Sequence, residues 1–156
     1  MNTYLMVKAL HILSSVLMVG TGFGTTFYLY FANRAGSREA ISVVSRLVVR
    51  ADLWFTTPAV IFQPISGLWL AHANGWPWTT GWIVASLILF AIAGACWLPV
   101  VWLQIRLRNI AAEAQHTQTT LPEQYWRYAK IWERLGYPAF IAMLGVYLLM
   151  VLKPAI

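Results

Sequence analysis

The sequence predicts an all-α integral membrane protein, a four-transmembrane-helix bundle with a short interfacial helix between spans three and four. Composition is the first reason: 60% of the 156 residues are hydrophobic and 10% are charged, whereas about 25% of the residues in a soluble domain are charged. The second reason is that the apolar residues gather in stretches near the roughly 20 residues that a spanning helix needs. We expect residues 1–156 to form a single integral membrane domain.

Four apolar stretches are the expected spans, and they cover residues 4–31, 51–71, 81–105 and 137–152. The first is longer than the core of a signal peptide, which has roughly 7–15 residues, so we expect it to be retained. Pro58 and Pro64 lie inside the second stretch. Prolines within a span predict kinks, because the backbone groups they free need other partners.

The short helix is expected at "TLPEQYWRYAKIWERL", residues 120–135. Aromatic and basic residues alternate along this stretch, which is typical of a helix lying on a membrane surface. Thr120 and Glu123 have the spacing of a capping box at its start. The polar residues just before it are expected to form a solvated loop.

Basic residues mark the two segments that join spans one and two and spans three and four. They are Arg34, Arg38, Arg46, Arg50, Arg106, Arg108, Arg127, Lys130 and Arg134. Because short loops rich in Lys and Arg stay in the cytoplasm, we expect a bacterial inner-membrane protein with both termini outside. This placement accounts for the net charge of +6, so the expected partner is the lipid bilayer and not nucleic acid. Asp52 lies beside Arg50, and the two are candidates for an ion pair.

His11 is the residue of greatest functional interest, because it lies about two turns, roughly 12 Å, inside the first span. On a helix it shares one polar or small face with Ser15, Met18, Gly22 and Thr25. An ionisable side chain at that depth is a candidate functional residue. Two interpretations remain open: a neutral imidazole that hydrogen-bonds a neighbouring helix, or a metal ligand, most naturally of haem iron.

Three further residues are candidates for the same site. Lys8 lies on nearly the same face as His11 and either pairs with a haem propionate or extends to the membrane surface. His72 ends the second span on the same side and is a candidate second ligand for a metal, and Met18 is a weaker one. Cys96 is the single cysteine, which excludes an intrachain disulfide and a cysteine metal cluster.

Three short motifs carry a resemblance to a known family: "VKALHIL" (7–13), "TTPAVIFQPISGLWL" (56–70) and "VLKP" (151–154). They resemble the HemJ-type family of small bacterial membrane proteins and the broader CopD-like copper-resistance group. The resemblance implies oxidation of protoporphyrinogen IX and b-type haem bound through the first-span histidine, here His11. The chain reads "GTTFYLYF" (24–31) where the family has a Pro-Arg pair, and "GWIVASLIL" (81–89) where it has a lysine. We therefore expect the haem site, more than the oxidase chemistry, to carry over.

The preferred functional prediction is a protein that binds b-type haem and serves in electron transfer or redox sensing. His11 would hold the haem near the outer side of the membrane. A protoporphyrinogen IX oxidase of the HemJ kind, and thus an oxidoreductase, is the enzymatic alternative. A copper-handling protein using imidazole and thioether ligands and an accessory subunit without a cofactor are the others. A quinone or porphyrin-type molecule is the expected small-molecule partner, and Gly20 and Gly24 have the spacing that permits a homodimer.

Overall fold

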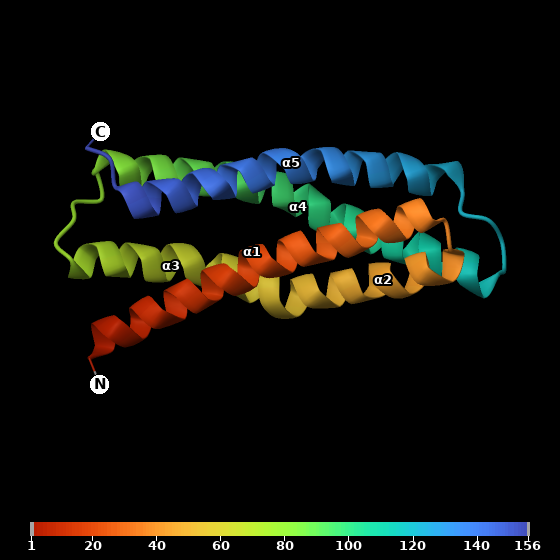
Figure 1. Ribbon diagram of the computed structural model, residues 1–156, viewed down its shortest axis with the longest axis horizontal. Coiled ribbons are helices and arrows are strands. Elements are labelled where there is room, and N and C mark those ends of the chain that lie inside the picture. Colours follow the sequence, from red (N-terminus) through yellow and green to blue (C-terminus); the bar gives the residue numbers. More distant parts are fainter. Residues whose placement is uncertain (1, 156) are drawn as a thin grey trace.

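The computed structural model describes residues 2–155, and this part of the chain is helical without a β-strand (Figure 1). The all-α prediction is therefore confirmed. The helices are α1 (Thr3–Ala35), α2 (Arg38–Ala51), the π-helix η1 (Asp52–Thr56), α3 (Thr57–Ala73), α4 (Gly81–His116) and α5 (Glu123–Leu152).

The helices form two long hairpins that lie against each other (Figure 1). In the first, α1 runs back along α2, η1 and α3, which follow one another without a break; in the second, α4 pairs extensively with α5. Both termini and the loop 74–80 lie at one end of the bundle, which we call the terminal end. The turn 36–37 and the loop 117–122 lie at the other, the basic end.

Three helices, α1, α4 and α5, are long and apolar enough to cross a membrane. Large apolar side chains are exposed along them, among them Leu13 and Leu17 on α1 and Ile141 and Leu148 on α5. A contiguous apolar surface of this kind marks contact with lipid in a membrane protein. The helix α3 has 17 residues, fewer than the roughly 20 of a full span.

The helix expected at 120–135 is present from Glu123, but it leads directly into the last span as one continuous helix, Glu123–Leu152, so the prediction of a separate interfacial helix is wrong. The helix begins after Pro122, and no side chain caps it, so the capping box of Thr120 and Glu123 does not form. Tyr125, Ala129 and Trp132 are buried. Their spacing of four and three residues places them on one face, and this face packs onto the rest of the bundle. The stretch is therefore part of the bundle and does not lie on a surface.

The basic segments were expected to be loops, and this expectation is also wrong for most of their length. The first contains α2, whose N-terminus is capped by the Ser37 hydroxyl, an acceptor for the Ala40 N–H at 3.2 Å. Ile41, Ser45 and Val48 are buried along one face of α2. In the second segment α4 continues to His116, beyond the expected end of the span at residue 105. These helices are amphipathic, and the basic residues on their outer faces led to the prediction of loops.

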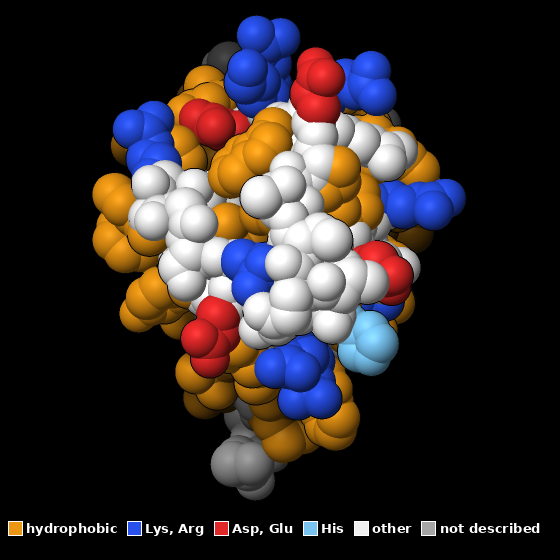
Figure 2. Space-filling model, turned by 90° about the vertical axis from the view of Figure 1, so that its right-hand side faces the viewer, with side chains coloured by type: hydrophobic (Ala, Val, Ile, Leu, Met, Phe, Trp, Pro, Cys, Tyr) orange, Lys and Arg blue, Asp and Glu red, His pale blue; other side chains and the backbone are white. Residues whose placement is uncertain are grey.

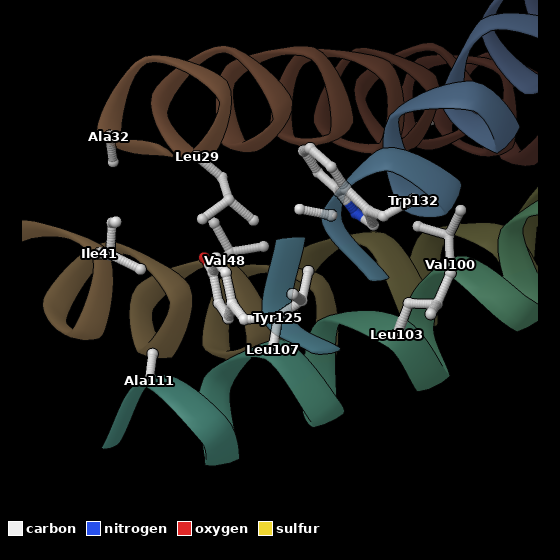
Figure 3. Packing of buried hydrophobic residues seen from close by; sticks show 11 residues of the cluster. Leu29, Ala32, Ile41, Val48, Val100, Leu103, Leu107, Ala111, Tyr125 and Trp132 are labelled. Atoms are coloured by element: carbon white, nitrogen blue, oxygen red, sulfur yellow. The ribbon is translucent and has the colours of Figure 1, made fainter. Parts of the chain in front are cut away.

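The basic end holds the larger buried cluster, which joins residues of α1, α2, α4 and α5 (Figure 3). Leu29, Ile41, Leu107 and Tyr125 have no solvent-exposed surface there. Figure 2 looks onto this end and shows Lys and Arg side chains around its rim, with acidic side chains between them. The end that carries the positive charge is therefore also the best packed part of the molecule.

The π-helix η1 ends two residues before Pro58, whose missing backbone N–H leaves the Trp54 carbonyl, four residues back, without its usual helical donor. The Thr57 N–H, just before the proline, bonds the carbonyl of Asp52 five residues back, which is the π-helical pattern. Within this segment the Thr56 hydroxyl donates to the Asp52 carboxyl at 2.9 Å. Asp52 therefore bonds Thr56, and Arg50 points to the exposed surface.

Candidate functional site

His11 on α1 faces α3 and contacts Gln63, Ser66 and Gly67 of that helix. The Nδ1 atom lies 2.7 Å from the Ser66 hydroxyl. The Gln63 side-chain amide donates to the His11 backbone carbonyl at 2.8 Å. A Cβ at Gly67 would lie 3.2 Å from His11 Cε1, so only a glycine leaves the imidazole ordinary contact distance at this position.

The contacts of the Ser66 hydroxyl favour the His11 tautomer that carries its hydrogen on Nδ1. The Ser66 oxygen lies 2.7 Å from the Phe62 carbonyl, which can only accept. A hydroxyl has one hydrogen to donate, so both contacts are satisfied when Ser66 donates to Phe62 and accepts from His11 Nδ1–H. Nε2 is then unprotonated and holds a free lone pair. A metal-ligating histidine has this arrangement, because its second nitrogen donates to a fixed acceptor.

His11 lines a cavity of about 370 Å³ between the two hairpins, which we call the terminal-side cavity. Ligand sites in proteins commonly have roughly 300–1,000 Å³. Its walls are mainly apolar side chains of α1, α3, α4 and α5, including Leu68, Ile83, Leu87 and Val146. Such walls suit a large, flat and apolar ligand.

Donor groups gather around the same cavity. Lys8 and Lys153 both line it. Trp82 also lines it, and its indole Nε1–H is buried without a hydrogen-bond partner among the described residues. An unpaired buried donor is unfavourable until an acceptor reaches it. Two ammonium groups and an indole N–H together favour a ligand that carries carboxylates.

The predicted site residues do not all lie around the same cavity. Lys8, His11 and Met18 line the terminal-side cavity. His72, the candidate second ligand, is exposed and packs edge-on against Trp78, with ring centroids 6.5 Å apart. It does not line that cavity, so the structure does not bring the two histidines together. The thioethers of Met143 and Met150 do line it, beside that of Met18.

The sequence interpretation missed Ser66, Gly67, Trp82 and Lys153 as partners of this site. Ser66 and His11 are 55 residues apart, and no local spacing connects them. The only signal is the small pair Ser-Gly within the large apolar side chains of α3, which permits a close approach of helices. No group of three or more His, Cys, Asp or Glu side chains placed to hold a metal occurs among residues 2–155.

The family model for DUF2269, described as a predicted integral membrane protein, matches residues 5–154. The chain belongs to this family. The DUF2269 match includes all five α-helices of the described chain almost from end to end. No curated protein matches the chain, and no solved structure does.

Proposed function

We propose that the terminal-side cavity binds b-type haem, with His11 Nε2 as an axial ligand of the iron. One observation carries the proposal: the Ser66 hydroxyl holds Nδ1, which leaves Nε2 free on a residue that lines an apolar cavity. Neutral imidazole is a common haem ligand. Haem would supply one-electron redox chemistry. The proposed function of the protein is electron transfer or redox sensing in the membrane.

The residues around the cavity fit this group in three respects. Apolar walls suit the macrocycle, and the free nitrogen of His11 suits the iron. Lys8, Lys153 and the orphaned Trp82 Nε1–H suit the two propionates, because charge-assisted hydrogen bonds to carboxylates are the strong ones. A thioether of Met18, Met143 or Met150 would be the second axial ligand, since these side chains line the cavity and His72 does not.

The test is a visible spectrum of the purified protein in detergent, oxidised and then reduced. We expect a Soret band and reduced α and β bands, all lost in His11→Ala. The matched control is His72→Ala, which removes an exposed imidazole outside the cavity and should leave the spectrum unchanged. A colourless protein that takes up no added haemin, or an unchanged spectrum in His11→Ala, would overturn the proposal.

A second candidate function is copper handling. It is favoured by three thioethers and one imidazole around one cavity, those of Met18, Met143, Met150 and His11, because soft sulfur ligands and imidazole suit Cu(I). Elemental analysis of the same preparation separates the two. One copper per chain in a colourless protein would support copper in place of haem. The HemJ-like oxidase remains the enzymatic form of the haem proposal, tested by adding protoporphyrinogen IX to the haem-loaded protein.

We further propose that η1 and α3 together form a fourth span, with both termini outside the cell. Support comes from large apolar side chains exposed along this stretch, among them Leu53, Trp54, Ile61 and Ile65. Lipid would cover them, and the basic residues would stay in the cytoplasm.

Cysteine labelling tests this topology in a Cys96→Ala background with Thr79→Cys or Thr120→Cys. Both threonines are exposed, one in each loop. A membrane-impermeant maleimide should label the first variant in intact cells and the second only after lysis. Labelling of both, or of the second alone, would contradict the proposal.

A further inference from the structure

A second cavity, of about 350 Å³, lies on the basic side of the bundle, and we call it the basic-side cavity. Aromatic rings form much of its wall. They belong to Phe23, Phe27, Tyr30, Phe31, Phe90, Trp97, Tyr137 and Phe140. Polar residues also line it: Asp52, Thr56 and Gln104, together with Thr25, Thr26 and Glu133. The cavity therefore combines wide aromatic surfaces with one compact polar cluster.

The polar cluster is built around the π-helix. Asp52 and Thr56 are the first and last residues of η1, and the Thr56 hydroxyl donates to the Asp52 carboxyl at 2.9 Å. Gln104, from α4, lines the cavity together with these two residues. Asp52 is 5% exposed, so its carboxyl is held inside the bundle. Single π-turns within helices are frequent at functional sites.

Gln104 leaves one polar atom of this cluster without a partner. The residue is 4% exposed, and its Oε1 atom is buried with no hydrogen-bond partner among the described residues. An amide oxygen can only accept, and a buried acceptor without a donor is unfavourable. The cavity therefore lacks a hydrogen-bond donor, and a ligand with a hydroxyl group would supply it.

We propose that the basic-side cavity binds the headgroup of a membrane quinol. Its ring would lie against the aromatic walls, where ring pairs are favourable, and a ring hydroxyl would donate to Gln104 Oε1. Membrane quinols dissolve in the bilayer. Because this cavity lies between helices whose exposed surfaces are apolar, a quinol would reach it from the lipid. The proposal concerns binding alone and does not depend on haem in the terminal-side cavity.

An organic cation is the competing ligand, since aromatic rings and a carboxylate also suit positive charge. Two acidic side chains, Asp52 and Glu133, line the cavity, and the Arg34 guanidinium lies 4.3 Å from the ring centroid of Tyr30 in its wall. The unpaired atom in the cavity decides for the quinol, because Gln104 Oε1 is an acceptor and a ring hydroxyl beside an aromatic ring supplies its donor.

Binding is tested with heptyl hydroxyquinoline N-oxide, a fluorescent and redox-stable quinol analogue, titrated onto the protein in lipid nanodiscs. Gly94→Phe should fill the cavity, because Gly94 lines it and an added Cβ there meets nothing within 4 Å. Gly20→Phe is the matched control: Gly20 has equally open surroundings but is exposed and lines neither cavity. Gln104→Leu removes the acceptor while keeping a similar side-chain volume.

We expect saturable binding of one analogue per chain in the unmodified protein, in Gly20→Phe and in His11→Ala. Gly94→Phe should lose it, and Gln104→Leu should bind about tenfold more weakly, as expected for one hydrogen bond to a buried group. His11→Ala keeps the two proposals separate, because it removes the haem ligand and leaves this cavity intact.

Three outcomes would overturn the quinol proposal. The first is no saturable binding, which would mean that lipid alone fills the cavity. The second is equal binding in Gly94→Phe and Gly20→Phe, which would place the analogue elsewhere. The third is binding of tetraphenylphosphonium but not of the analogue, which would make the cavity a cation site.

Discussion

At the basic end, side chains of four helices leave Ile41, Leu107 and Tyr125 without exposed surface. At the terminal end, α1 and α3 lie apart from α4 and α5 around a cavity of about 370 Å³, and a buried cluster of only Ala71, Trp82 and Ile83 remains. The same two hairpins therefore form the larger packed core at the basic end and only a small buried cluster at the terminal end.

Both ends contain buried polar groups. At the basic end the Tyr125 hydroxyl donates to Asn33 Oδ1 at 2.7 Å, and the buried Trp132 Nε1 has no partner among the described residues. At the terminal end Trp82 Nε1 has no partner among the described residues, and the Lys8 ammonium lines the cavity. The difference between the ends is therefore one of packing: the larger core lies at the basic end, and the cavity proposed to bind a ligand lies at the terminal end.

The strongest test of this division is a pair of matched leucine truncations. Leu107→Ala, in the packed end, should lower the free energy of unfolding by about 2–5 kcal/mol, because it leaves a cavity in a fully buried site. Leu87→Ala, whose side chain lines the terminal-side cavity and is 38% exposed, should cost about 0.5 kcal/mol. Unfolding by SDS in mixed micelles measures both, and equal losses would contradict the comparison.

At the terminal end, Ser66→Ala should change ligand binding more than folding. Loss of the hydroxyl frees His11 Nδ1, and loss of such a partner typically weakens metal binding by about 10–100-fold. Titration of added haemin measures this, with Ser86→Ala as the control. Ser86 lines the same cavity, but its hydroxyl donates to the Trp82 carbonyl of its own helix. The same loss of affinity in both variants would count against a special role for Ser66.

At the basic end, Tyr125→Phe should reduce stability by about 1 kcal/mol, because the Asn33 acceptor loses its donor. Tyr137→Phe is the control, since Tyr137 is 60% exposed and makes only a 3.4 Å contact with Glu133. The same SDS titration compares them. If the two variants unfold alike, the buried hydroxyl has no net stabilising effect.

The smallest expected effect is that of Arg38→Lys, about 0.5 kcal/mol. The Arg38 guanidinium donates to the side chains of Gln115 and Gln118 and to the Thr119 carbonyl, and a lysine cannot reproduce this forked geometry. Arg46→Lys should have no effect, because Arg46 is exposed. A lower unfolding temperature in Arg38→Lys than in Arg46→Lys would support a stabilising contact between α2 and the end of α4. Equal unfolding temperatures would exclude it.

Helices could be predicted from the sequence where nearly all of their residues are apolar. Long apolar stretches predicted α1, α4 and α5 as spans, and all three are helices long and apolar enough to cross a membrane. The helical extensions were missed, because α2 and the first turns of α5 are amphipathic and read as basic segments. Their buried residues, such as Ile41, Val48 and Tyr125, pack against helices distant in the sequence, and that packing, more than local propensity, makes them helical.

The candidate site was predictable only in part for a similar reason. His11 and Lys8 stood out as ionisable residues within an apolar helix. The contacts that give His11 its chemistry come from Ser66 and Gly67, across a helix pair that no periodicity predicts. Asp52 was visible as an acid at the edge of an apolar stretch, but its partner in the structure is Thr56, four residues on, and not the adjacent Arg50.

Three side chains, Met18, Phe90 and Met143, line both cavities at once. A shared wall has one set of rotamers at a time, so a ligand that shifts these side chains in one cavity changes the shape of the other. Thermodynamic linkage then makes the influence mutual: whatever factor one occupant applies to the affinity of the second, the second applies to the first. Under the two binding proposals, occupancy of one cavity would therefore change the affinity of the other through the side chains that both share.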